Sequence, residues 1–135
     1  MRIFLIAFAI ALPLSANAQV YKCAVLKHWR NAVLDRNYIS DNPEPTDGAT
    51  FTLDFPASKI FTGSSGTAID GKVVAPPGAN SIGMLGGGVR ELAIYTVFPN
   101  FPDPQGGVLG SVLRINDNDY MPKGTMMTRL SCKRG

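Results

Sequence analysis

Apolar and polar side chains alternate with a period of two in several short stretches of this chain, a pattern typical of β-strands that bury one face. The clearest stretch is 50–55, where Phe51, Leu53 and Phe55 alternate with two threonines and an aspartate. We expect these three side chains to lie in the core. Less regular alternation predicts strands in six further segments: 21–26, 59–62, 67–74, 90–98, 107–115 and 126–132.

The alternation also predicts which residues of a strand share a face. If the cysteine of the first segment faces inward, Tyr21 and Val25 do so too. The same condition in the last segment turns Met126 and Leu130 inward. In segment 107–115, Ser111 separates three apolar residues that share one face: Leu109, Leu113 and Ile115.

Turn-forming residues divide these segments. The dipeptide Asp70-Gly71 suits the positive φ of a tight turn, so we expect segment 67–74 to be a hairpin. Segment 29–38 fits a short helix or a strand equally well. Proline, glycine and asparagine mark three loops: 41–48, 75–88 and 99–107.

Composition agrees with a fold built from short strands. The chain has 14 glycines and 10 prolines, and it contains about seven predicted strands in succession. Consecutive strands joined by such turns form antiparallel sheets. We therefore expect an all-β protein, either a small antiparallel β-barrel or a sandwich.

Residues 1–18 have the pattern of a secretory signal peptide. The apolar run 3–14 is too short for a membrane-spanning helix, which needs about 20 residues. The run is followed by small side chains up to Ala18, as at a signal-peptidase site. We expect cleavage after Ala18, which leaves 117 of the 135 residues as a single β domain (19–135) with no transmembrane segment. The mature protein would be periplasmic or secreted.

The expected export predicts how the two cysteines are used. In an oxidising compartment two cysteines form a disulfide more readily than a metal site. Cys23 and Cys132 lie near the two ends of the mature chain, so a bridge across their 109-residue separation would join the first strand to the last. No Cys-x-x-Cys motif is present and His28 is the only histidine, so we expect neither a metal nor a cofactor.

Charge and motifs exclude several other functions. The formal net charge is +3, about +2 without residues 1–18, and the basic residues are scattered, so we expect no nucleic-acid partner. Segment 116–119 begins like a calcium loop, but Pro122 and Thr128 stand where an EF-hand has its glycine and glutamate. We interpret it as a turn. No nucleophile elbow surrounds a serine, and we expect no enzymatic activity.

Three short motifs give the chain a resemblance to a known family. Tyr21-Lys22-Cys23 opens the first strand, Ser131-Cys132-Lys133 closes the last, and Ser64-Ser65-Gly66-Thr67 forms a mid-chain loop. With the signal peptide, these motifs resemble the small exported β-barrels that inhibit c-type lysozyme. Members of that family carry a Ser-Gly-x-x-Tyr loop that plugs the lysozyme cleft. Ser65 and Gly66 match that loop, and Ile69 stands at the tyrosine position.

We therefore predict an exported non-enzymatic binding protein, and the resemblance implies an inhibitor of a lysozyme-like hydrolase that acts through a surface loop. The candidate binding residues are Ser64, Ser65, Gly66, Thr67 and Lys72. The alternative is a carrier of a small apolar ligand in the mouth of a barrel. Its cavity would be lined by five aromatic residues: Trp29, Tyr95, Phe98, Phe101 and Tyr120.

Overall fold

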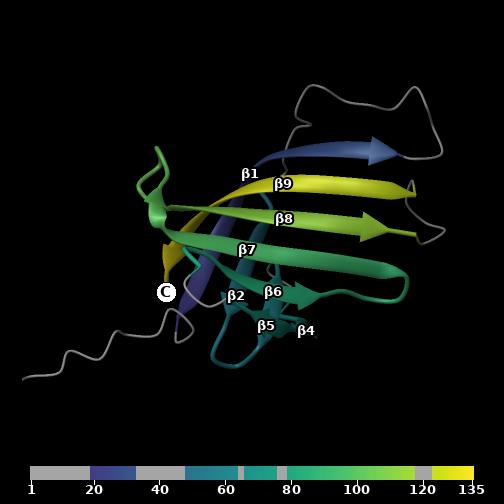
Figure 1. The fold of residues 1–135 in the computed structure, drawn as a ribbon, viewed down its shortest axis with the longest axis horizontal. Coiled ribbons are helices and arrows are strands. Elements are labelled where there is room, and N and C mark those ends of the chain that lie inside the picture. The colour runs from purple at the N-terminus through teal and green to yellow at the C-terminus, as the bar shows by residue number, and fades with distance from the viewer. Residues whose placement is uncertain (1–18, 33–47, 64–65, 76–78, 118–122) are drawn as a thin grey trace, which may run out of the picture.

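The computed structural model describes residues 19–32, 48–63, 66–75, 79–117 and 123–135. In these ranges nine antiparallel strands form one sheet that curls into a nearly closed barrel (Figure 1). The strands are β1 (Val20–Ala32), β2 (Thr50–Asp54), β3 (Lys59–Thr62), β4 (Ala68–Asp70), β5 (Lys72–Val74), β6 (Ile82–Gly86), β7 (Glu91–Pro102), β8 (Val108–Asn116) and β9 (Gly124–Arg134). The predicted all-β class is confirmed, and the structure is a barrel rather than a sandwich. The predicted signal peptide lies outside the described residues.

The strand order is β4-β3-β2-β1-β9-β8-β7-β6-β5. Strands that follow one another in the chain are neighbours in the sheet, except for β4 and β5. The first and last strands, β1 and β9, pair in the middle of the sheet over most of their length (Figure 1). The two edge strands, β4 and β5, follow one another in the chain and are separated only by Gly71. The barrel is therefore closed on one side by the pairing of the chain ends.

The opposite side of the barrel is bridged by a bend in segment 68–74. The first half of this segment, β4, pairs with β3, and the second half, β5, pairs with β6. The hairpin predicted at Asp70-Gly71 is wrong, because β4 and β5 do not pair with each other. The N–H of Gly71 instead donates a hydrogen bond to the carbonyl oxygen of Ser58, at 2.8 Å. One bent segment thus supplies both edge strands of the sheet.

Several segments predicted as loops are strands. The predicted loop 75–88 contains β6, whose Ile82 and Met84 are buried. The segment was predicted as a loop because glycine is typical of loops, although Ile82 and Met84 alternate with glycine and leucine. The predicted loop 99–107 begins inside β7, which continues to Pro102 with a shift of register after Phe98. The structure has nine strands instead of about seven, because β6 was not predicted and the single predicted segment 67–74 forms two strands, β4 and β5.

The sequence of segment 29–38 fits a short helix and a strand equally well. Its described part, 29–32, continues β1, and its remaining residues lie outside the described ranges. A β-bulge between Val25 and Lys27 shifts the register of β1 against β9. Bulges bend a strand and redirect the side chains that follow. Trp29 consequently pairs with Met127, which points away from the core.

Side chains from both halves of the sheet meet in the barrel interior. The ring of Phe51 contacts that of Tyr95 at a centroid distance of 5.5 Å, and Tyr21 contacts Phe55 at 6.1 Å, both edge to face. The buried apolar residues form one cluster: Tyr21, Cys23, Leu53, Phe55, Ile60, Ile82, Met84, Ala93, Tyr95, Val97, Val112, Leu130 and Cys132. The predicted core positions of β2 are confirmed, with Phe51 packed against this cluster. The interior is therefore occupied by the protein's own side chains.

The predicted disulfide joins Cys23 and Cys132, which are direct cross-strand partners on β1 and β9. Their Cα atoms lie 4.0 Å apart and both side chains are buried. Gly110 of β8 makes room for the bridge, because a Cβ atom there would lie 2.8 Å from Sγ of Cys132. The disulfide thus fastens the two chain ends together at the centre of the sheet.

Candidate functional site

The loop predicted from the family resemblance is only partly described. Ser64 and Ser65 lie outside the described residues, whereas Gly66 and Thr67 are exposed. Lys72 is exposed on β5, beyond the bend at Gly71. Ile69, at the position of the family's tyrosine, is half-buried and packs against the core cluster. The side chain at this position is therefore held by the barrel rather than presented to a partner.

The aromatic residues predicted to line one cavity are separated by the barrel wall. Tyr95 belongs to the buried core, whereas Phe98 and Phe101 line a hollow on the outer surface. Trp29 pairs with the exposed Met127, and Tyr120 lies outside the described residues. The cavity expected in the barrel mouth is not formed by the described members of this set.

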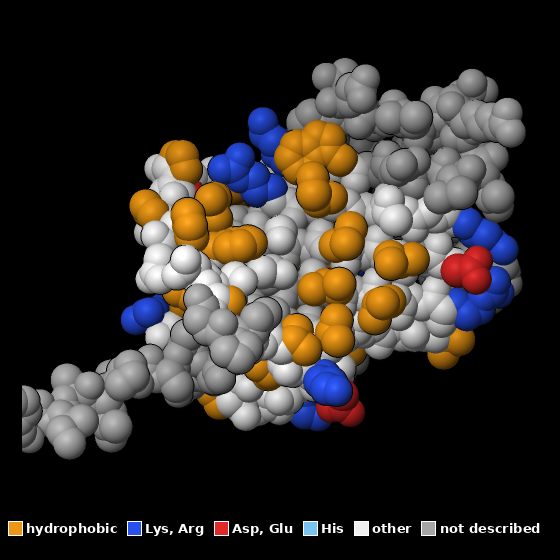
Figure 2. Space-filling model, viewed as in Figure 1, with side chains coloured by type: hydrophobic (Ala, Val, Ile, Leu, Met, Phe, Trp, Pro, Cys, Tyr) orange, Lys and Arg blue, Asp and Glu red, His pale blue; other side chains and the backbone are white. Residues whose placement is uncertain are grey.

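A continuous row of apolar side chains crosses the outer surface of five neighbouring strands. Each member of the row is the cross-strand partner of the next, in the order Trp29, Met127, Leu113, Ile94 and Leu85. A second cross-strand pair, Leu92 and Ile115, lies beside the row. We call these seven residues the outer apolar face, and Figure 2 shows hydrophobic side chains gathered on this side of the barrel.

Much of the outer apolar face is accessible to solvent. Met127 is 52% exposed and Leu113 is 42% exposed, although both belong to long strands at the centre of the sheet. The prediction that Leu113 and Ile115 share a face of β8 with Leu109 is confirmed, but this is the outer face. The inner side of β8 instead carries Gly110 and Val112, both buried.

Two basic side chains stand directly opposite each other at one end of the outer apolar face. Lys27 of β1 is the cross-strand partner of Arg129 of β9, and both are exposed. Like charges in directly opposed positions destabilise a sheet. At the other end, Arg90 and Lys123 share the carboxylate of Asp117, with N–O distances of 3.2 and 3.5 Å. Figure 2 shows Lys and Arg side chains at two opposite ends of the apolar patch. We call Lys27, Arg129, Arg90 and Lys123 the basic rim.

A tight turn after β7 places one carboxylate beside the first pair of basic residues. Asp103 is only 5% exposed and accepts hydrogen bonds from the Ser131 hydroxyl and from the backbone N–H of Gln105. The backbone N–H of Asp103 donates to the carbonyl oxygen of Gly107 at 2.9 Å. The sequence signal for this turn is Asp103-Pro104, since Asp-Pro pairs favour turn initiation. The turn is thereby held against β9.

Hydrogen bonds lower the pKa of the Asp103 carboxyl below its ordinary value. The Ser131 hydroxyl contributes most, followed by the Gln105 N–H, and Arg129 and Lys133 add weaker electrostatic effects, while desolvation acts in the opposite direction. The pKa of Asp117 is also lowered, chiefly by its hydrogen bond to Arg90. Both carboxylates therefore hold their negative charge at the edges of the outer apolar face.

The lowered pKa of Asp103 predicts a stability effect confined to acid pH. A carboxyl whose folded pKa lies below its unfolded value stabilises the fold above about pH 4, and this contribution is lost as the pH falls through the folded pKa. Asp103→Asn should therefore lower the melting temperature at neutral pH, and its difference from wild type should shrink on acidification. Melting curves between about pH 2 and pH 7 measure this, and Ser131→Ala should reduce the same pH dependence. A difference that stays constant over this range would contradict the prediction.

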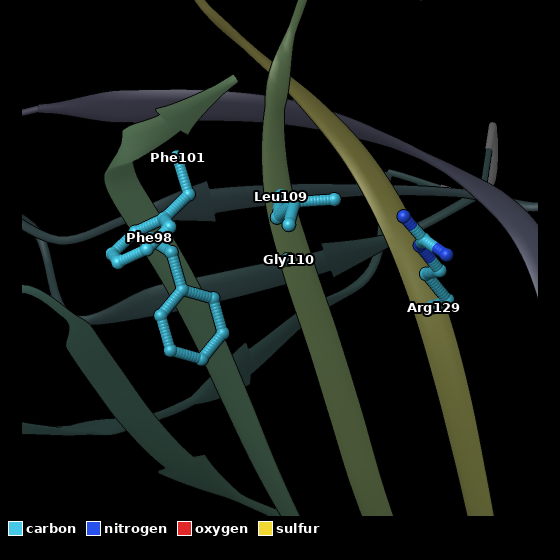
Figure 3. Close-up of a pocket in the computed structure, with 5 residues that line it drawn as sticks. All are labelled: Phe98, Phe101, Leu109, Gly110 and Arg129. Atoms are coloured by element: carbon cyan, nitrogen blue, oxygen red, sulfur yellow. The ribbon is translucent and has the colours of Figure 1, made fainter. Parts of the chain in front are cut away.

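Two neighbouring surface hollows meet at Arg129. One hollow, of about 290 Å³, is lined by Phe98, Phe101, Leu109, Gly110 and Arg129 (Figure 3). The other, of about 230 Å³, is lined by Leu26, Lys27, Asp103, Pro104, Gln105 and Arg129. The first hollow is almost wholly apolar, whereas the second is mixed, because Lys27, Asp103 and Gln105 line it beside apolar atoms. Arg129 therefore stands between an apolar hollow and one with charged side chains in its wall.

In the part of the chain that the structure describes, no group of three or more His, Cys, Asp or Glu side chains is arranged to hold a metal ion. These ranges also contain no helix of the length and apolarity needed to cross a membrane. Among family models, curated proteins and solved structures, none matches this chain.

Proposed function

We propose that this protein is a binding protein that contacts another protein through its outer apolar face. The observation that carries the proposal is the row of apolar cross-strand partners on the outer surface of β1, β9, β8, β7 and β6, half-buried at its ends and exposed at Met127 and Leu113. Single exposed apolar residues are ordinary, but a contiguous apolar patch rimmed by polar residues marks an interaction surface. Covering this face would remove apolar area from water, which favours association.

The basic rim favours a partner whose contact surface is rimmed by acidic residues. Lys27 and Arg129 repel each other across the β1–β9 pair, and Arg90 and Lys123 share one carboxylate. Opposite charges on a partner would speed encounter and select against basic surfaces. This preference works against a cationic lysozyme as the partner.

The proposed location is outside the reducing cytoplasm. The Cys23–Cys132 disulfide is consistent with an oxidising compartment, where such bonds persist. With the predicted cleavage after Ala18, the protein would act in the periplasm or after secretion. A partner would then be an exported or extracellular protein.

Site-specific photocrosslinking in the cell that makes the protein tests the binding surface. A photoreactive amino acid in place of Leu113 should give one discrete crosslinked product with another protein. The same amino acid at Ala68, an exposed position on β4 away from this face, should not. Charge reversal by Lys27→Glu with Arg129→Glu should weaken the crosslink at position 113. Equal crosslinking at positions 113 and 68, or a product of twice the protein's own mass, would contradict the proposal.

The lysozyme target is tested separately with the purified protein. If the loop resemblance identifies the target, the protein should inhibit a c-type lysozyme at micromolar concentration, and substitution of Ser65 or Gly66 should weaken the inhibition. Absence of inhibition would refute the lysozyme target and leave the outer apolar face as the proposed binding surface. The two hypotheses are thus tested by separate experiments.

A further inference from the structure

We propose that the hollow beside Arg129 binds a free single-chain carboxylate, with its alkyl chain on Phe98, Phe101 and Leu109 and its head group on Arg129 and Lys27. This site shares Lys27 and Arg129 with the basic rim, but its apolar wall is separate from the outer apolar face, and it does not depend on the function proposed for that face. Its ligand belongs to the chemical class of medium-chain fatty acids.

The apolar part of the hollow is built by two strands and a shift of register. Leu109 of β8 is the cross-strand partner of Phe98, and β7 then shifts its register before Pro102. This irregularity leaves the ring of Phe101 edge to face with that of Phe98, at a centroid distance of 6.1 Å. Phe101 remains 47% exposed. Figure 3 shows the two rings on one strand, Leu109 on the next and Arg129 on the strand beyond.

The size of the hollow limits the ligand to one short chain. Its volume of about 290 Å³ lies near the lower end of the range of about 300 to 1,000 Å³ that is usual for small-molecule sites. A short alkyl chain could displace water from the apolar wall formed by Phe98, Phe101 and Leu109. Two acyl chains would exceed the space, which disfavours a membrane phospholipid.

The charged end of the site is formed by the opposed pair of basic residues. Lys27 and Arg129 are direct cross-strand partners, so an anion placed between them would offset their repulsion. The guanidinium of Arg129 can donate two parallel hydrogen bonds to one carboxylate. Asp103 lines the same hollow and its negative charge offsets part of this positive charge, but its oxygens accept hydrogen bonds from the Ser131 hydroxyl and the Gln105 N–H rather than from Lys27 or Arg129.

The two hollows together match the two ends of such a ligand. Arg129 lines both, so a carboxylate bound to Arg129 would lie where the apolar hollow meets the one with charged walls. The second hollow is open to solvent and is lined partly by Lys27 and Gln105, so the head group would stay hydrated. The alkyl chain would then extend in the opposite direction, toward Phe98.

Titration with decanoate, below the concentration at which it forms micelles, tests the proposal. We expect saturable binding by calorimetry, with amide NMR shifts concentrated on β7, β8 and β9 near the hollow. Decanol, which lacks the charge, should bind about tenfold more weakly or worse, because charged hydrogen bonds are the stronger ones. Arg129→Gln should cause a similar loss, whereas Arg134→Gln, at the exposed end of β9, should not.

Three results would overturn the proposal. Equal binding of decanoate and decanol would show that the basic residues do not contribute. Unchanged binding by a folded Arg129→Gln variant would place the ligand elsewhere. Binding to anionic phospholipid vesicles without binding to free decanoate would show that the site recognises a membrane surface instead of a free ligand. Leu113→Ser should leave decanoate affinity unchanged, so failure of the outer apolar face and failure of this site can be distinguished.

Discussion

Replacement of both Cys23 and Cys132 by alanine is expected to lower the free energy of unfolding by about 4 to 5 kcal/mol. The bond closes a loop of 109 residues, so its absence enlarges the ensemble of unfolded conformations available to nearly the whole described chain. Single domains have total stabilities of about 5 to 15 kcal/mol, so the variant would be marginally stable. Urea unfolding of the oxidised wild type and the double variant measures the difference.

Reduction of the wild-type protein provides the control for this experiment. If chain entropy is the main effect, the reduced wild type and the double alanine variant should lose similar amounts of stability. The two cysteines are fully buried beside Gly110 and Leu130, so a packing defect would add to the loss in the alanine variant alone. A total loss below about 1 kcal/mol in both forms would contradict the chain-entropy model.

Leu130→Ala is expected to destabilise the protein by about 2 to 5 kcal/mol, because it removes a fully buried side chain from the core cluster. Leu130 lies on β9, two residues before the disulfide, where β1 and β8 flank it. The cavity left behind cannot close easily, since both neighbouring strands are held in register. Chemical unfolding followed by circular dichroism measures the change.

Met127→Ala is the matched control, since Met127 is an apolar residue of the same strand that is 52% exposed. Surface substitutions usually change stability by less than about 0.5 kcal/mol. A large loss for Leu130→Ala with a small one for Met127→Ala would support the inward and outward assignment along β9. Equal losses would contradict it.

The strands best predicted from sequence were those with a regular alternation of apolar and polar residues. In the predicted segment 50–55, Leu53 of β2 and Phe55 just after it lie in the core as expected, because the intervening polar side chains leave one choice of inner face. β6 was missed because its glycines, among them Gly83, are typical of loops. Gly83 fits a strand here because Val74, its cross-strand partner on β5, approaches so closely that a Cβ atom at Gly83 would lie 3.0 Å from the Val74 side chain.

The candidate sites were the least predictable part of the molecule. The hollow at Arg129 draws residues from β7, β8 and β9, and depends on a shift of register that no local pattern signals. The opposition of Lys27 to Arg129 depends likewise on the β-bulge after Val25. A site made by pairing between strands far apart in the chain leaves no compact motif in the sequence.

Local patterns were enough to predict an all-β protein and the pairing of Cys23 with Cys132, because strand periodicity and cysteine number are properties of short segments and of composition. They also grouped Leu109, Leu113 and Ile115 on one face of β8, but only the assembled barrel shows that this face is the outer one. Alternation defines two faces of a strand without saying which is inside. The register against β9 decides it, because Val108 pairs with the inward-facing Cys132 and turns the alternate residues of β8 to the solvent.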